Sequence, residues 1–162
     1  YGMICDASFP THMLAYWTRD RKSGRLPLEW AVKALARDPA LALGFKDRGL
    51  LAPGYKADLN VIDYDRLALH APEIRFDLPA GGRRLNQTAE GFDVTMVGGK
   101  ISYREGTPTD ALPGRLVRGA QPAPACSSPD ADRLFFGGRA MPPARDSRLL
   151  APATHLSTPA DV

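Results

Sequence analysis

The stretch DRGLLAPGYKADLNVID, residues 47–63, contains the change of pattern that decides the fold. Pro53-Gly54 suits the two central positions of a type II turn, because Gly accepts the positive φ that the second position needs. Residues 57–63 then predict a short strand with Leu59, Val61 and Asp63 on one face. The stretch therefore predicts a turn-rich link that leads into a β-strand.

The residues before this stretch predict helices. Residues 1–12 predict a loop in which Ser8 or Thr11 caps a helix and Pro10 suits its first turn. Apolar residues then follow at helical spacing, namely Met13, Leu14, Tyr16 and Trp17. The polar run from Arg19 to Gly24 predicts the end of this helix.

A second helix is predicted to begin at Pro27. The N–H groups of a first helical turn have no partner within the helix, so a proline there costs no hydrogen bond. Its apolar stripe consists of Leu28, Ala31, Val32, Leu35 and Ala36. Asp38-Pro39 predicts a break, because proline disfavours helical geometry in the preceding residue. A short helical turn over residues 40–43 would then end at Gly44.

The residues after the stretch predict antiparallel strands. Residues 74–78 predict one strand, and residues 94–97 and 100–103 predict two more around Gly98-Gly99, which favours a type I′ hairpin turn. Gly81-Gly82-Arg83-Arg84 predicts an ordinary basic loop. Helices followed by strands indicate an α+β chain.

From Gln121 onward the sequence is rich in Pro, Ala, Ser and Asp, and only residues 134–136 and 149–150 are locally apolar. Such a segment buries too little apolar surface to offset its ordering entropy, so we expect residues 121–162 to be mostly disordered.

Composition and charge exclude several function classes. The 162 residues carry a formal net charge of +3. The basic residues are scattered; even the cluster of Arg19, Arg21 and Lys22 is too short to predict nucleic-acid binding. No apolar run is long enough to span a membrane.

Two distant cysteines, Cys5 and Cys126, favour a cytoplasmic protein. Because the chain begins at Tyr1, we expect it to be a fragment or a processed product.

Residues that could hold a metal are sparse and dispersed. The three histidines, His12, His70 and His155, lie in different segments, and no H-x-H or H-E-x-x-H motif occurs. Cys5 is more simply a buried structural thiol than a reactive one. The residues therefore predict neither a metal site nor a catalytic residue within this chain.

Residues 47–63 resemble the G-x-x-x-P-G-x-x-A-D-L element of the amidohydrolase superfamily, in which the chain leaves a catalytic (β/α)8 barrel and enters a small β-sandwich. Residues 31–44 resemble the helices behind the last barrel strand, and residues 95–103 resemble late sandwich strands. Residues 5–11 and 77–85 are similar to N-acyl-D-amino-acid deacylases (D-aminoacylases) of amidohydrolase family 3.

The resemblance implies the closing barrel helices over residues 1–46, part of a composite sandwich over 47–120, and the tail over 121–162. It also implies a zinc-dependent hydrolase of non-peptide C–N bonds whose metal ligands and catalytic Asp lie outside this chain. The loop of residues 1–11 would line the catalytic face. Asp6, Ser8 and His12 are then expected near the pocket for a small amide substrate, and the chain is expected to pack on the missing N-terminal barrel.

Two alternatives remain open at this point. The chain could be a non-catalytic structural module that has lost its barrel. It could also belong to a different amidohydrolase of the hydantoinase, dihydroorotase or deaminase type, which shares the C-terminal pattern.

Overall fold

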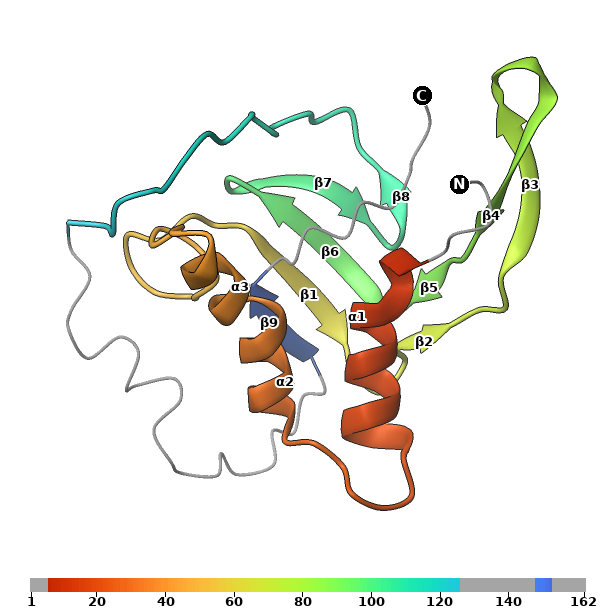
Figure 1. Ribbon diagram of the computed structural model, residues 1–162, viewed down its shortest axis with the longest axis horizontal. Coiled ribbons are helices and arrows are strands. Elements are labelled where there is room, and N and C mark those ends of the chain that lie inside the picture. The colour runs from red at the N-terminus through yellow and green to blue at the C-terminus, as the bar shows by residue number, and fades with distance from the viewer. Residues whose placement is uncertain (1–5, 126–147, 153–162) are drawn as a thin grey trace.

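The computed structural model describes residues 6–125 and 148–152 and places short helices beside an antiparallel sheet (Figure 1). The helical elements come first in the chain. They are η1 (Asp6–Ser8), α1 (Phe9–His12), η2 (Met13–Asp20), α2 (Leu28–Leu35) and α3 (Arg37–Ala42). A short helical turn, η3 (Pro79–Gly81), lies later in the chain. This confirms the predicted mixture of helices and strands.

The strands form one larger sheet and two ribbons, and all their pairings are antiparallel. The larger sheet has the order β8-β7-β6-β1-β9, and the ribbons pair β2 with β5 and β3 with β4. The strands are β1 (Leu59–Asp63), β2 (Ala68–Leu69), β3 (Glu73–Leu78), β4 (Gly82–Asn86), β5 (Ala89–Glu90), β6 (Phe92–Val97), β7 (Lys100–Arg104), β8 (Thr107–Pro108) and β9 (Arg148–Pro152).

A small apolar core joins the helices to the sheet. Ala31 and Leu67 are fully buried, and Ile62 of β1 is 2% exposed. Leu14 and Ala15 of η2 complete this buried cluster, and half-buried residues pack around it, namely Met13, Leu28, Val32, Leu35 and Phe92. The predicted stripe of the second helix is therefore the face that meets the sheet.

The first helical region starts earlier than predicted. The residues expected to form a loop already form η1 and α1, with Pro10 in the first turn of α1. Ser8 is at the N-cap position, but its side chain makes no capping hydrogen bond there, and Thr11 is buried inside the helix. The expectation of a loop was wrong for residues 6–12, because their side chains make tertiary contacts that local propensity does not report.

The following turns of this region are wider than an α-helix. The N–H of Arg21 donates to the carbonyl of Tyr16, five residues back, at 2.9 Å. Thr18 donates its hydroxyl to the carbonyl of Leu14. A hydroxyl bonded to the carbonyl four residues earlier competes with the backbone ladder, which is consistent with the π-helical form of η2.

The predicted break at Asp38-Pro39 was wrong by two residues. The backbone leaves helical geometry at Ala36, with φ −123° and ψ −65°, and Pro39 lies in the first turn of α3. The first turn of a helix leaves its N–H groups without intrahelical partners, so a proline there removes no hydrogen bond. Asp38-Pro39 thus belongs to a helix start and not to a helix end.

Three predicted turns are confirmed by their backbone angles. Gly44 ends α3 with φ +75°, and Gly54 follows Pro53 with φ +86°. Gly98 and Gly99 have φ +57° and +76°, and the hairpin that they form pairs Val97 with Lys100. At each of these positions the backbone has a positive φ, which glycine adopts without a steric penalty, so the glycine itself favours the turn.

The strand predicted over residues 57–63 is confirmed as β1, which has Leu59, Val61 and Asp63 on one face and Asn60 and Ile62 on the other. Asn60 and Ile62 are 4% and 2% exposed, whereas Leu59, Val61 and Asp63 are half-buried. Asn60 is accommodated because its Oδ1 accepts a hydrogen bond of 2.8 Å from Thr95 on β6. A satisfied polar side chain can therefore occupy the inner face.

Two segments for which the sequence predicted another structure form strands. Gly82–Asn86 is strand β4 rather than a basic loop. Arg148–Pro152, within the predicted tail, forms β9 and pairs with β1. Residues 121–125 of that tail are described, and Gln121 forms a bridge with Phe45, whereas residues 126–147 and 153–162 lie outside the described residues.

The β3–β4 hairpin extends away from the body of the molecule (Figure 1). All six residues of β3 are exposed, including Phe76 at 70%. Arg84 on β4 contacts both carboxylate oxygens of Asp77 on β3, at 2.7 and 2.5 Å. The hydrogen bond from Arg84 holds the pKa of Asp77 below its ordinary value.

Candidate functional site

The three predicted pocket neighbours lie at the start of the helical region. Asp6 is exposed in η1. Ser8 donates its hydroxyl to Gln87 Oε1 at 2.6 Å, which links η1 to the segment before β5. His12, at the end of α1, is exposed and stacks on Tyr16 with ring centroids 5.1 Å apart and an angle of 11° between the ring planes.

Ser8 and His12 therefore contact different parts of the molecule. A surface pocket is present elsewhere, and the three are not among its lining residues. That pocket lies between Arg66, residues 89–93 and the β7–β8 turn at Glu105 and Gly106. Whether Asp6, Ser8 and His12 lie near a substrate remains a prediction.

The zinc centre implied by the resemblance does not fit the described residues. Across residues 6–125 and 148–152, no three His, Cys, Asp or Glu side chains are grouped so that they could hold a metal ion. His12 ends α1, whereas His70 follows β2 and donates its backbone N–H to Thr88. Cys5, Cys126 and His155 lie outside the described residues.

The loop of residues 47–56 is closed at its base by Asp47 and Lys56. The backbone N–H of Lys56 donates to the carbonyl of Asp47 at 2.9 Å. The Asp47 carboxylate contacts Arg48 Nε at 3.0 Å and Lys56 Nζ at 3.2 Å. Burial raises the pKa of Asp47, but the hydrogen bonds and charges of Arg48 and Lys56 outweigh it and leave the pKa below its ordinary value. An ionised, doubly paired carboxylate of this kind suits a structural link better than proton transfer.

Gly49 lets this loop pack against the break between α2 and α3. Its φ is +76°, and a Cβ built there would lie 2.8 Å from the carbonyl oxygen of Ala36 and 3.0 Å from the Cβ of Ala40. The next residue, Leu50, is 4% exposed. Gly49, the first glycine of the motif, therefore lets the loop backbone approach the helix backbone at Ala36 closely. Leu50 anchors the loop through its buried side chain.

Asp58 connects the motif to the later hairpin. Its Oδ1 accepts a hydrogen bond of 2.7 Å from the backbone N–H of Gly98. Next to it, the carbonyl of Ala57 accepts a hydrogen bond from the N–H of Gly99 at 3.0 Å. The A-D-L segment thus holds the Gly98-Gly99 turn, so two stretches that carry the resemblance contact each other directly.

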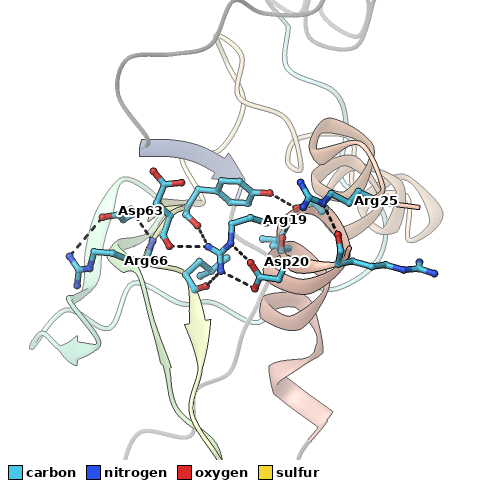
Figure 2. A network of polar contacts seen from close by, with 11 residues as sticks. Arg19, Asp20, Arg25, Asp63 and Arg66 are labelled. Atoms are coloured by element: carbon cyan, nitrogen blue, oxygen red, sulfur yellow. Dashed lines mark hydrogen bonds and ion pairs between the residues drawn. The ribbon is translucent and has the colours of Figure 1, made fainter. Parts of the chain in front are cut away.

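Arg19 fixes the end of η2 to the turn between β1 and β2 (Figure 2). Its guanidinium donates to the backbone carbonyls of Tyr64, Asp65 and Leu67, the last at 2.8 Å. Asp20 accepts from the same guanidinium at 2.6 Å, and this hydrogen bond raises the pKa of Arg19. In the sequence, Arg19 is one of three nearby basic residues, and no local pattern distinguishes it from Arg21 and Lys22.

The site as a whole is a structural junction. The motif loop, the hairpin turn and Arg19 each join the helices or the sheet to a neighbouring segment. The polar groups involved are paired with one another or with backbone, which suits them to positioning rather than to bond cleavage.

The sequence of residues 1–103 matches the family described as "Amidohydrolase family". The chain belongs to the amidohydrolase family. The matched region contains the motif loop, the helices and the Gly98-Gly99 hairpin, so the junction described above lies inside the family's common sequence.

Curated relatives of this amidohydrolase chain carry two kinds of name. The chain is 40% identical over 82 residues to a 5-methylthioadenosine/S-adenosylhomocysteine deaminase from Desulfitobacterium hafniense, in each of the strains DSM 10664 / DCB-2 and Y51. The aligned region covers 49% of this chain and 18% of each relative. It is 47% identical over 53 residues to an imidazolonepropionase from Ruegeria sp. (strain TM1040), which covers 33% of this chain and 13% of the relative.

The chain therefore spans less than a fifth of the length of these relatives. No solved structure gives a significant match to it. Among the described residues of this amidohydrolase, no helix is both long enough and apolar enough to pass through a membrane.

Proposed function

We propose that this chain is part of a metal-dependent hydrolase that cleaves non-peptide C–N bonds in small molecules. The observation that carries the proposal is the family match over residues 1–103. The contacts of Asp47, Gly49 and Asp58 support it, because they give the family motif a physical role in joining the helices to the sheet.

In this proposal the chain supplies scaffold rather than chemistry. Residues 1–46 form the last loop and closing helices of the catalytic barrel, and residues 47–120 form part of the sandwich. The metal would be held by residues beyond those described, since the described residues do not fit it. Asp6, Ser8 and His12 would line the substrate pocket from the loop that follows the last barrel strand.

The outer faces of the helices support packing on another part of the protein. Phe9 is 61% exposed, Trp30 is 50% exposed and Leu43 is 66% exposed. Phe9 is in α1, Trp30 is in α2 and Leu43 directly follows α3, and exposed apolar side chains that gather in one patch are typical of a surface that another element covers. We infer that the N-terminal barrel covers this surface.

Three substrate classes compete. The similarity of residues 5–11 and 77–85 to D-aminoacylases favours N-acyl-D-amino acids, with a carboxylate and a D-amino acid as products. The names of the curated relatives, a 5-methylthioadenosine/S-adenosylhomocysteine deaminase and an imidazolonepropionase, favour a different amidohydrolase instead, of the deaminase, hydantoinase or dihydroorotase type. The relatives support only the reaction class that these candidates share.

An assay of the protein that contains this chain would decide between them. N-acetyl-D-amino acids, 5′-methylthioadenosine and cyclic amides are offered in parallel, and D-amino acid, ammonia and ring-opened product are measured separately. Release of D-amino acid alone supports the deacylase, and release of ammonia alone supports the deaminase. Failure to hydrolyse any of the three with zinc present would count against the hydrolase proposal.

The remaining alternative, a non-catalytic module, makes a different prediction. A module that needs no barrel should be monomeric and unfold cooperatively as the 162-residue chain alone. The hydrolase proposal predicts aggregation of the isolated chain, because the exposed helix faces would have no partner. Size-exclusion chromatography and thermal unfolding of the isolated chain distinguish the two.

A further inference from the structure

The feature that carries a further inference is the outer edge of strand β3 (Figure 1). Among the described residues, β3 has one neighbour in its sheet, β4, and the two strands form a ribbon of their own. The ribbon extends away from the body of the molecule, and all six residues of β3 are exposed. A strand edge of this kind offers backbone N–H and C=O groups to another strand.

One face of β3 is apolar. Because side chains alternate along a strand, Ile74, Phe76 and Leu78 point to the same side of the ribbon. They are 50%, 70% and 41% exposed, and Leu85, the partner of Ile74 on β4, extends the same face. Exposed apolar side chains grouped in this way are typical of a surface that meets a partner.

The other face of β3 is charged. Arg75 Nε donates to Glu73 at 2.7 Å, and the Asp77 carboxylate accepts from Arg84 on β4. The register with β4 shifts between Arg75 and Leu78. The contact with Arg84 nevertheless keeps Asp77 on the face of Arg75, because Arg75 and Arg84 are partners in the register. β3 therefore presents a positive and a negative side chain two residues apart on one face.

The sequence of β3 is complementary to itself about Phe76. In an antiparallel pair centred on that residue, Phe76 meets Phe76 of a second copy. Arg75 of each copy then lies opposite Asp77 of the other, and Ile74 lies opposite Leu78. Opposite charges and apolar pairs directly across two strands stabilise a sheet, whereas like charges destabilise it. Every cross-strand pair from residue 74 to residue 78 is therefore favourable.

Other registers lack this complementarity. A pair centred on Arg75 sets Arg75 against itself, and one centred on Asp77 sets Asp77 against itself. A pair centred on Ile74 leaves residues 76–78 without partners in β3. A pair centred between two residues sets apolar side chains opposite charged ones. Charges usually protect an edge strand from pairing, but the order of the charges in β3 favours one register with a second copy.

The hairpin itself gives Arg75 a like charge across its strands. The register places Arg75 directly opposite Arg84 of β4, and like charges in that position are destabilising. A carboxylate placed opposite Arg75 at the outer edge would offset the charge of Arg84. Asp77 of a second copy would take that position.

We propose that the outer edge of β3 is an interface at which two copies of this chain associate. The two β3 strands pair antiparallel about a two-fold axis at Phe76, and the two ribbons become one four-stranded sheet. Both copies use the same patch in such an interface, so the patch must be complementary to itself, as β3 is. The inference does not depend on the proposed hydrolase activity.

Exchange of charge tests the interface on the whole protein. In the dimer, Arg75→Asp sets carboxylates opposite each other, and Asp77→Arg sets guanidinium groups opposite each other. Each variant alone should dimerise at least about tenfold more weakly than the wild type. Mixed in equal amounts, the two variants should form a heterodimer, because every cross-strand pair again joins opposite charges. Sedimentation velocity over a range of protein concentrations measures the association.

Arg115→Asp is the matched control for charge, because Arg115 is exposed and lies outside the helices and strands. It changes the net charge as Arg75→Asp does and should leave the association unchanged. A wild-type protein that stays monomeric at every concentration rejects the proposal. A mixture of the two β3 variants that associates no more strongly than either variant alone rejects it as well.

Disulfide trapping tests the register without a change of charge. In a chain that also carries Cys5→Ser and Cys126→Ser, Phe76→Cys places two thiols directly opposite each other across the axis. Opposite residues of antiparallel strands have Cα atoms about 4.5–5.5 Å apart, which is within disulfide range. Ile74→Cys is the control, since its two copies would stand four residues apart along the strands, about 13 Å.

We expect a crosslinked dimer from Phe76→Cys and little crosslinking from Ile74→Cys. Equal yields, or a higher yield from Ile74→Cys, would show that β3 does not pair about Phe76 and would reject the proposal. In a monomeric protein, a Phe76→Cys thiol that resists alkylation would show that another part of the protein covers β3. That result also rejects the second copy as the partner.

Discussion

The Asp58 carboxylate accepts the backbone N–H of Gly98 at 2.7 Å, across a separation of forty residues in the sequence. The bond joins the residue just before β1 to the turn of the β6–β7 hairpin. Since β1 and β6 are neighbours in the sheet, Asp58 fixes the end of their shared register. The acidic residue of the family motif therefore has a structural role in this chain.

Replacement of Asp58 tests that role. Asp58→Ala should lower the free energy of unfolding by about 1 kcal/mol, the usual contribution of one hydrogen bond at a partly exposed site. Asp58→Asn keeps an acceptor oxygen and should recover most of the loss. Chemical denaturation of the whole protein measures both. If the two variants lose the same stability, the hydrogen bond to Gly98 is not the cause.

Gly49 and Gly106 form a matched pair because each has φ +76°. Alanine at either position should cost about 1–2 kcal/mol for the left-handed backbone. Only at Gly49 would the new Cβ also meet Ala36 and Ala40, and we expect about 1–3 kcal/mol more there. At Gly106 a new Cβ would meet nothing within 4 Å. Equal thermal destabilisation of the two variants would contradict the close approach of the loop to the helix break.

Asp47 predicts how stability depends on pH. Its folded pKa lies below the ordinary value of 3.8, so its stabilising contribution is complete above that value and is lost as the pH falls through the folded pKa. Asp47→Asn should therefore flatten the acid side of the stability curve and cost stability at neutral pH. Asp110→Asn, at a position outside the helices and strands, is the control. The unfolding midpoint of each variant is measured between neutral and acid pH. If Asp47→Asn leaves the pH dependence of the midpoint unchanged, the prediction is wrong.

Arg19 should not be replaceable by lysine. A guanidinium donates to three carbonyls in different directions, whereas an ammonium on a lysine stem cannot reproduce that fork. Arg19→Lys should cost about 1–3 kcal/mol, in the range of hydrogen bonds to charged groups. It should also speed amide exchange in residues 64–67. Arg25→Lys is the control, because Arg25 is exposed and its guanidinium donates to the nearby carbonyl of Arg21.

Asp6 provides a test of the predicted pocket in the active protein. Its side chain is exposed, so Asp6→Asn should leave the unfolding midpoint unchanged. If Asp6 lines the substrate pocket, kcat/KM should fall by roughly tenfold, equivalent to about 1.4 kcal/mol of binding energy. Glu29→Gln, at an exposed position on α2, should leave kcat/KM as it is. Unaltered kinetics in Asp6→Asn would remove this residue from the pocket.

Local chemistry explains which parts of the fold the sequence could predict. Gly44, Gly54 and the Gly98-Gly99 pair impose positive φ, so their turns follow from the residues themselves. The apolar stripe of α2 could likewise be predicted, because it follows from the helical spacing of apolar residues within that helix. Pro39 misled the prediction because proline suits a helix start as well as a helix end, and only the tertiary position of Ala36 decides between them.

Contacts between distant residues explain the rest. β9 depends on pairing with β1, and Arg19 depends on carbonyls more than forty residues away; neither leaves a local pattern. For the site, the motif of residues 47–63 pointed to the family, but the contacts that make it a junction became visible only in the fold. The placement of Asp6, Ser8 and His12 beside a substrate stays a prediction, because no contact of the described residues tests it.

The extended β3–β4 hairpin has a practical consequence for protein engineering. Its tip at Ala80 and Gly81 is exposed, and a Cβ built at Gly81 meets nothing within 4 Å. Exposed loop tips accept inserted sequence because no buried backbone must move. A small affinity tag or a fluorescent reporter spliced between these two residues would stand clear of the core, and would report on the whole protein without disturbing the junction between helices and sheet.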